Sequence, residues 1–203
     1  MIRRITLLIA VVALVCGTAT AGPIIATAGT LAVTPAFQSV LIGTPVAVDL
    51  VYSGLTPVGA FDVDVTWNPA ILSLTGVSFS LNLGNLGLFE AAGAATPLGP
   101  DLVDIFEVSF LTGAGLAGLQ GLGPISLSTL NFNTIGLGTT PVSFSGVPNL
   151  ELLISDADGL MITSTFVGGS VEVTAPNLVP EPATILLLLS GLGAGAWFRR
   201  RAA

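Results

Sequence analysis

The chain has 203 residues, of which 52% are hydrophobic and only 8% are charged, with one cysteine and no histidine. This length supports one domain or slightly more. Because histidine is absent and cysteine occurs once, the chain alone cannot form a Ser-His-Asp triad, a Cys-His pair, a Cys/His zinc site or an internal disulfide.

The charges are segregated along the chain. All five basic residues are arginines near its two ends, Arg3, Arg4, Arg199, Arg200 and Arg201, and all twelve acids lie between these clusters. A body without lysine or arginine repels phosphate backbones, so we expect no nucleic-acid partner. Such an anionic surface suits solubility and cation binding outside the cell.

Residues 1–21 have the three parts of a signal peptide. A short basic stretch with Arg3 and Arg4 precedes the apolar residues 5–15, and Ala19 and Ala21 form an A-x-A site before Gly22. This order predicts export and cleavage between Ala21 and Gly22. The alternative is an uncleaved N-terminal anchor.

Short apolar-polar alternations separated by Gly, Pro and Asn run from residue 31 to residue 173. A period of two predicts strands, and no stretch has the charged face of an exposed helix. Residues 84–100 and 111–124 are Gly-rich and predict long loops, the first with a short helix near residues 88–95. The expected strands, about nine in an all-β sandwich or jelly roll, are residues 31–42, 46–52, 61–67, 71–80, 102–110, 125–132, 142–145, 150–154 and 167–173.

The C-terminal part predicts a membrane segment. Residues 174–182 form a linker, residues 183–198 are uncharged, and residues 199–203 form a basic tail. As a helix, residues 183–198 are about 24 Å long, slightly short for a bilayer core but able to span it with local thinning. The arginines place the tail in the cytoplasm and the acidic body on the far side of the membrane.

This ending resembles the PEP-CTERM sorting signal of Gram-negative bacteria. Pro180, Glu181 and Pro182 match its Pro-Glu-Pro motif, residues 183–198 its apolar helix, and residues 199–201 (Arg199, Arg200, Arg201) its basic end. The resemblance implies processing by an exosortase and delivery to the cell surface or the medium, with a transient or retained anchor. The alternative is an ordinary C-terminal anchor, and a sorting signal says nothing about activity.

The body resembles the cohesin family. Residues 59–72 are similar to its third strand with the following Asn-Pro turn, residues 130–132 and 138–144 to its late strands, and residues 155–159 to the polar turn before its last strand. The resemblance implies a nine-stranded jelly-roll sandwich of the carbohydrate-binding-like superfold over residues 31–173. Another Ig-like or fibronectin-like sandwich is the alternative. Cohesins bind dockerins, but a lone domain without scaffold repeats leaves the partner open, because fold alone does not determine function.

Two groups of carboxylates are candidate sites. Asp156 and Asp158, with Gly159 after them, have the spacing that opens a calcium loop, although the later bidentate Glu is missing. The alternative is a β-turn in which aspartates accept hydrogen bonds from backbone amides. In the strand at residues 102–110, Asp104 and Glu107 point to opposite faces, which argues against a general acid and base pair formed by them and the neighbouring Asp101.

The aromatic side chains of Tyr52, Phe61 and Trp67 suit core packing better than a sugar-stacking platform, and the alternation places Asp62 and Asp64 on a solvated face. We therefore expect an exported, non-enzymatic module that binds a partner at the surface or contributes to the matrix, with a link to exopolysaccharide or biofilm implied by the sorting signal. Its partner is a protein or a polysaccharide, and calcium is the only candidate cofactor. The alternatives are a carbohydrate-binding module and a glycoside hydrolase.

Overall fold

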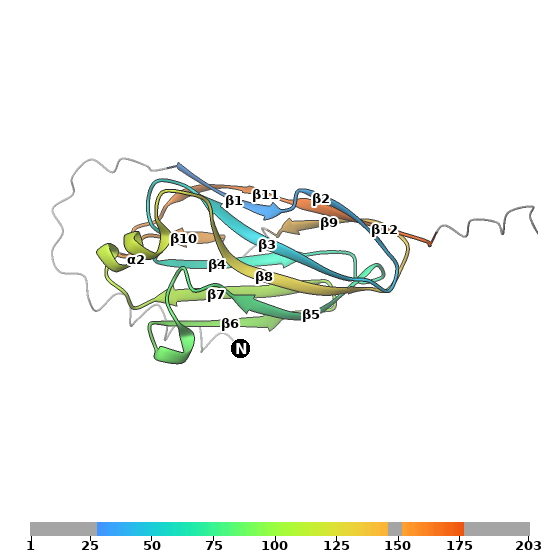
Figure 1. Cartoon of the computed structure of the whole chain (residues 1–203), viewed down its shortest axis with the longest axis horizontal. Helices are drawn as coiled ribbons and strands as arrows, with labels where there is room; N and C mark the ends of the chain where they lie inside the picture. The colour runs from blue at the N-terminus through green and yellow to red at the C-terminus, as the bar shows by residue number, and fades with distance from the viewer. Residues whose placement is uncertain (1–27, 146–151, 177–203) are drawn as a thin grey trace, which may run out of the picture.

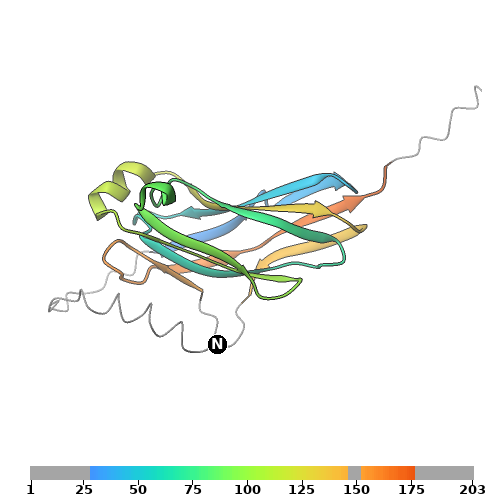
Figure 2. The same ribbon diagram turned by 90° about the horizontal axis from the view of Figure 1, so that it is seen from below.

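The computed structural model describes residues 28–145 and 152–176, whose strands form two facing β-sheets (Figures 1 and 2). The five-stranded sheet has the order β11 (Thr163–Val167), β1 (Ala28–Thr34), β3 (Pro45–Ser53), β8 (Ile125–Thr134), β5 (Leu72–Phe79). The seven-stranded sheet has the order β2 (Phe37–Leu41), β12 (Gly169–Thr174), β9 (Gly138–Phe144), β4 (Ala60–Thr66), β7 (Leu102–Ser109), β6 (Ala91–Pro97), and β10 (Leu153–Ser155) also pairs with β4. The short helices are η1 (Leu86–Leu88) and α2 (Gly113–Gln120).

The core lies between the inner faces of the two sheets. In β3 the buried side chains are Val46, Val48, Leu50 and Tyr52, every second residue, as a half-buried strand requires. The ring of Trp67 packs edge-on against Phe132 of the opposite sheet, with 5.1 Å between ring centroids. The expected all-β sandwich is therefore confirmed.

Three expectations about the elements were wrong. Residues 31–42 are two strands, because the chain leaves the first sheet at Pro35, which has no N–H for a ladder, and β2 joins the other sheet. The short helix expected near residues 88–95 lies earlier, at η1, and residues 91–97 form strand β6, whose pairing with β7 overrides the helix propensity of alanine. Residues 111–124 contain helix α2 instead of a plain loop. With β11 (Thr163–Val167), another strand that was not expected, the described residues contain twelve strands, more than the nine expected.

The two ends of the sandwich differ. One end, which we call the apical end, carries α2, η1 and the connections β3–β4, β5–β6, β7–β8 and β10–β11 (Figures 1 and 2). At the other end the backbone of Ile42 donates to the carbonyl of Thr174, the last residue of β12. The C-terminal segment therefore leaves the sandwich at the end opposite α2.

Among the described residues, no helix is long and apolar enough to span a membrane. The predicted signal peptide (residues 1–21) and the predicted sorting helix (residues 183–198) lie outside the described residues.

Candidate binding surfaces

The outer face of the seven-stranded sheet carries three carboxylates on two adjacent strands. Because Val63 and Val65 point into the core, Asp62 and Asp64 of β4 lie on the outer face. Asp104 of β7 lies directly opposite Asp64 in the antiparallel register. We call Asp62, Asp64 and Asp104 the acidic face.

Asp64 differs from the solvated residue that the alternation predicts. Asp62 is exposed as expected, but Asp64 is only 3% exposed, and its Oδ1 atom has no hydrogen-bond partner. Burial and, second, the charge of Asp104 raise the pKa of Asp64 to about 6. Like charges directly opposite each other on paired strands are unfavourable. A cationic group placed over this pair would therefore be favoured.

Glu107 points to the other face of β7, into the core. Its side chain is 0% exposed and neither carboxylate oxygen has a hydrogen-bond partner. Burial raises its pKa to about 7. The neighbouring strand has Gly93 at this place, where an added Cβ would lie 3.2 Å from the Cβ and Cγ atoms of Glu107. As predicted, Glu107 and Asp104 point to opposite faces, so they cannot act together on one substrate.

The aromatic residues weighed as a sugar platform are part of the core. Tyr52, Phe61 and Trp67 are 2%, 2% and 5% exposed, and the indole Nε1 of Trp67 donates to the carbonyl of Leu72. A stacking platform needs exposed ring faces, so these residues provide none.

The turn that holds Asp156 and Asp158 is closed by its own hydrogen bonds. Oδ1 of Asp156 accepts from the backbone amides of Asp158 and Leu160, both at 2.9 Å. No group of three or more acidic, cysteine or histidine side chains suited to a metal ion occurs within residues 28–145 and 152–176. Calcium at Asp156 and Asp158 stays a prediction, and the turn is explained without it.

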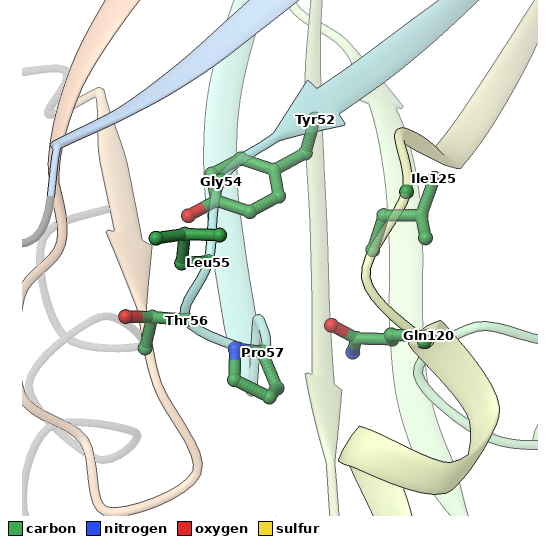
Figure 3. Close-up of a pocket in the computed structure, with 9 residues that line it drawn as sticks. Tyr52, Gly54, Leu55, Thr56, Pro57, Gln120 and Ile125 are labelled. Atoms are coloured by element: carbon green, nitrogen blue, oxygen red, sulfur yellow. The ribbon is translucent and has the colours of Figure 1, made fainter.

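Two hollows in the described part of the structure are small. The apical one, between the β3–β4 loop and the end of α2, is about 10 Å³, room for about one water (Figure 3). Gln120 points from α2 toward that loop, where it bonds both backbone groups of Val58. The second, at the opposite end, is about 260 Å³, below the usual range for small ligands of about 300–1,000 Å³. It is lined by Trp67, Pro69, Leu72, Ser73, Leu74, Pro97, Gly99 and Pro100.

Residues 178–202 match the family model of the PEP-CTERM protein-sorting motif. The match includes Pro180, Glu181 and Pro182 and the three arginines, so the expected sorting signal is confirmed. The motif indicates an exported protein that is sorted to the cell surface. These residues, like Ala19, Ala21 and Gly22 at the predicted signal cleavage site, lie outside the described part of the chain.

The fold is similar to solved cohesin domains. The sixth cohesin of scaffoldin B from Acetivibrio cellulolyticus, solved with a Cel5 dockerin mutant, is 17% identical with a TM-score of 0.56, and the alignment covers 73% of this chain and 100% of that one. A non-cellulosomal cohesin from the archaeon Archaeoglobus fulgidus is 13% identical (TM-score 0.53, 72% and 91% covered). CaCohA2 from Clostridium acetobutylicum is 18% identical (TM-score 0.56, 71% and 91% covered). At these identities the likeness shows the fold alone, and no curated protein matches the chain.

Two features of these surfaces were missed in the sequence. The pairing of Asp64 with Asp104 depends on strand register, for which no local pattern exists. The apolar character of the apical end was also missed, since residues 84–100 and 111–124 were expected to be Gly-rich loops and residues 155–159 a polar turn. A scan for loops without charged residues would have found the β3–β4 and β7–β8 connections, but not the two that contain Glu90, Asp156 and Asp158.

Proposed function

We propose that this chain is an exported, surface-displayed module, not an enzyme, that binds a protein partner through the acidic face. The observation that carries the proposal is the direct opposition of Asp64 and Asp104 beside the exposed Asp62 on the outer side of the sheet. Asp64 is buried there without a partner for Oδ1. A partner that places a lysine or arginine over this pair would relieve the repulsion.

The distribution of charge supports a basic partner. The described residues contain no lysine or arginine, so they offer no cation of their own to the Asp64–Asp104 pair. Complementary charges steer association and select partners. The likeness to cohesins supports the same idea, since one similar cohesin was solved with a dockerin. We infer a dockerin-like or other small protein partner with basic residues on its contact surface.

The sorting motif supports the placement of this module. An exosortase would recognise residues 178–202 after export, and the sandwich would stand outside the membrane from which the tail emerges. Release into a polysaccharide matrix or retention at the membrane would follow that step. Neither the hollows nor the buried aromatic residues favour a polysaccharide as the direct ligand.

The test is capture of surface proteins from the producing organism by the full chain held in detergent. We compare the wild type with a variant that carries Asp62→Lys and Asp104→Lys. The variant should lose at least nine-tenths of the captured partner, because both changes reverse the charge that the partner meets. The variant with Asp49→Lys and Asp158→Lys, at two aspartates outside the acidic face, makes the same change of net charge and is the control.

The outcomes are distinct. Loss in the double variant but not in the control supports the acidic face, and capture should also weaken with added salt. Equal capture by all three proteins contradicts it. Retention of exopolysaccharide alone, unchanged by the substitutions, would favour the carbohydrate-binding alternative.

A further inference from the structure

Exposed apolar side chains gather at the apical end of the sandwich. Sixteen large hydrophobic residues are exposed in the described part of the chain, and nine of them lie on the four apical connections. Among them Leu55, Phe89 and Leu122 are each more than 80% exposed. The nine, which we call the apical patch, are Leu55, Leu81, Leu88, Phe89, Phe110, Leu119, Leu122, Leu160 and Met161.

The four connections are held together, so the patch is one surface. The Gln120 side chain at the end of α2 bonds Val58 in the β3–β4 loop and the carbonyl of Asn82 before η1. The backbone N–H of Phe110 donates to the carbonyl of Glu90, 2.8 Å away. At the start of α2, a Cβ on Gly113 would lie 3.6 Å from the Cβ of Ala157 in the β10–β11 turn.

Helix α2 has no polar outer side. Its only polar residue, Gln120, is buried, and Leu116 is the other buried one. The exposed remainder consists of Gly, Ala and Leu119. A surface helix normally turns charged or polar residues to water, and one that is apolar all round is normally covered. The composition of α2 therefore indicates that another surface covers it.

Phe89 is held in a conformation that glycine would adopt at lower cost. It follows η1 with φ = 59° and ψ = 28°, and its N–H caps the helix by donating to Leu86. A bulky residue at positive φ is uncommon and strained, and such strain is a sign of function. Its ring is 86% exposed, so packing within the chain does not explain its presence.

The area of the apical patch, the charges near it and the position of the C-terminal tail bear on what covers the patch. A fully exposed side chain of this kind corresponds to about 60–120 Å² of apolar surface, and the nine are on average about 70% exposed, so the patch exposes about 400–750 Å². This area reaches or exceeds the few hundred Å² that a monomer usually exposes and approaches the roughly 800 Å² that each partner contributes to a stable interface. The charges near the patch, Glu90, Asp156 and Asp158, are all acidic, so they oppose contact with an anionic lipid surface and also with a second copy, and the apolar area must outweigh them.

The position of the C-terminal tail is a further argument that the apical patch does not contact the membrane in which the chain is anchored. The chain leaves the sandwich beside Ile42, and the ten residues of β8 place that exit about 30 Å from α2. The sorting motif begins at residue 178, only two residues beyond the last described one. The apical patch therefore points away from the tail.

We propose that the apical patch is a self-association surface, through which two copies of this chain meet tip to tip. An apolar surface can bury itself against an identical apolar surface, and a two-fold contact places the same patch of both copies face to face. This contact is independent of the acidic face, which lies on the outside of the seven-stranded sheet. Two copies whose C-terminal tails are anchored in separate membranes could be joined in this way.

The first test is a site-specific disulfide in the full chain in detergent. In a Cys16→Ser background, Leu122→Cys places a thiol on the apical patch, and Ile135→Cys places one at the opposite end, where Ile135 is 54% exposed. Under mild oxidation the Leu122→Cys protein should form dimers at least ten times faster. Association driven by the tails would favour Ile135→Cys and would overturn the proposal, as would equal rates.

The second test separates association from folding. Phe89→Gly removes the ring and relieves the positive φ, so the melting temperature should not fall, whereas the dimer dissociation constant in sedimentation equilibrium should rise at least tenfold. Phe37→Ala, which removes another exposed ring on β2, is the control and should leave the constant unchanged.

The remaining outcomes decide against self-association. A wild-type chain that stays monomeric overturns it, and if Phe89→Gly then reduces capture of a different protein, the patch belongs to that protein. The double variant Asp62→Lys and Asp104→Lys should still dimerise, so failure of the acidic-face proposal would be seen separately.

Discussion

Replacing Glu107 by glutamine should change how the stability of the protein depends on pH. Glu107 is fully buried on β7 without a hydrogen-bond partner, and burial raises its pKa from the ordinary 4.5 to about 7. Between these two values the folded state holds a proton that the unfolded state has released. The free energy of unfolding therefore falls as pH rises through this window, and the stabilisation is complete only below about pH 4.5.

The magnitude follows from the two pKa values. From pH 5 to pH 8, Glu107 alone should lower the free energy of unfolding by about 2.5 kcal/mol. Burial and Asp104 raise the pKa of Asp64 from 3.8 to about 6, which adds about 1 kcal/mol in the same direction. The wild type should thus lose roughly 3–4 kcal/mol over this range, whereas Glu107→Gln should lose only the part due to Asp64.

Urea unfolding at pH 5 and pH 8, followed by circular dichroism, measures both quantities. Glu107→Gln should be more stable than the wild type at pH 8 and close to it at pH 5. Glu172→Gln, a partly exposed residue on β12, controls for the loss of one negative charge. If the wild type and Glu107→Gln lose the same stability between the two pH values, Glu107 is not the buried acid described above.

Three further changes test other parts of the structure. Trp67→Ala should cost about 3–5 kcal/mol of unfolding free energy in urea, because it empties a core position, and it should leave any binding to polysaccharide unchanged. Gln120→Ala removes three hydrogen bonds to Val58 and Asn82, so it should cost about 2–4 kcal/mol and speed hydrogen exchange in α2, and unchanged exchange would show that other contacts hold the helix. Asp156→Ala should cost about 1 kcal/mol through the lost turn bonds, and if calcium binds there, millimolar calcium should raise the melting temperature of the wild type but not of this variant.

Strand character and side-chain alternation could be predicted from local sequence. The period of two in β3, β4 and β7 correctly placed Trp67 in the core and Asp104 and Glu107 on opposite faces. The alternation in β7 could not say which face is the core, because apolar residues occur on both. Pairing with β4 and β6 decides this, and it buries Glu107 beside Gly93.

Features that depend on contacts distant in sequence were not predicted. The alanines of β6 favour a helix until β7 lies beside them as a partner. Asp64 and Asp104 are forty residues apart, and only the register of the sheet brings them together. The apical patch is built from four connections that are distant in sequence. A single exposed apolar residue in a loop is ordinary, and these residues form a surface only because the fold brings the connections to one end.

The claim that the acidic face binds the partner is tested most directly by site-specific photo-crosslinking. A photo-crosslinking amino acid is placed at one position at a time in the full chain, which is then illuminated in the presence of the captured surface partner. A probe at Asp62, on the acidic face, should crosslink to the partner. A probe at Thr30, on strand β1 of the opposite sheet, should not. Crosslinking from Thr30 with none from Asp62 would contradict the assignment of the acidic face as the binding surface.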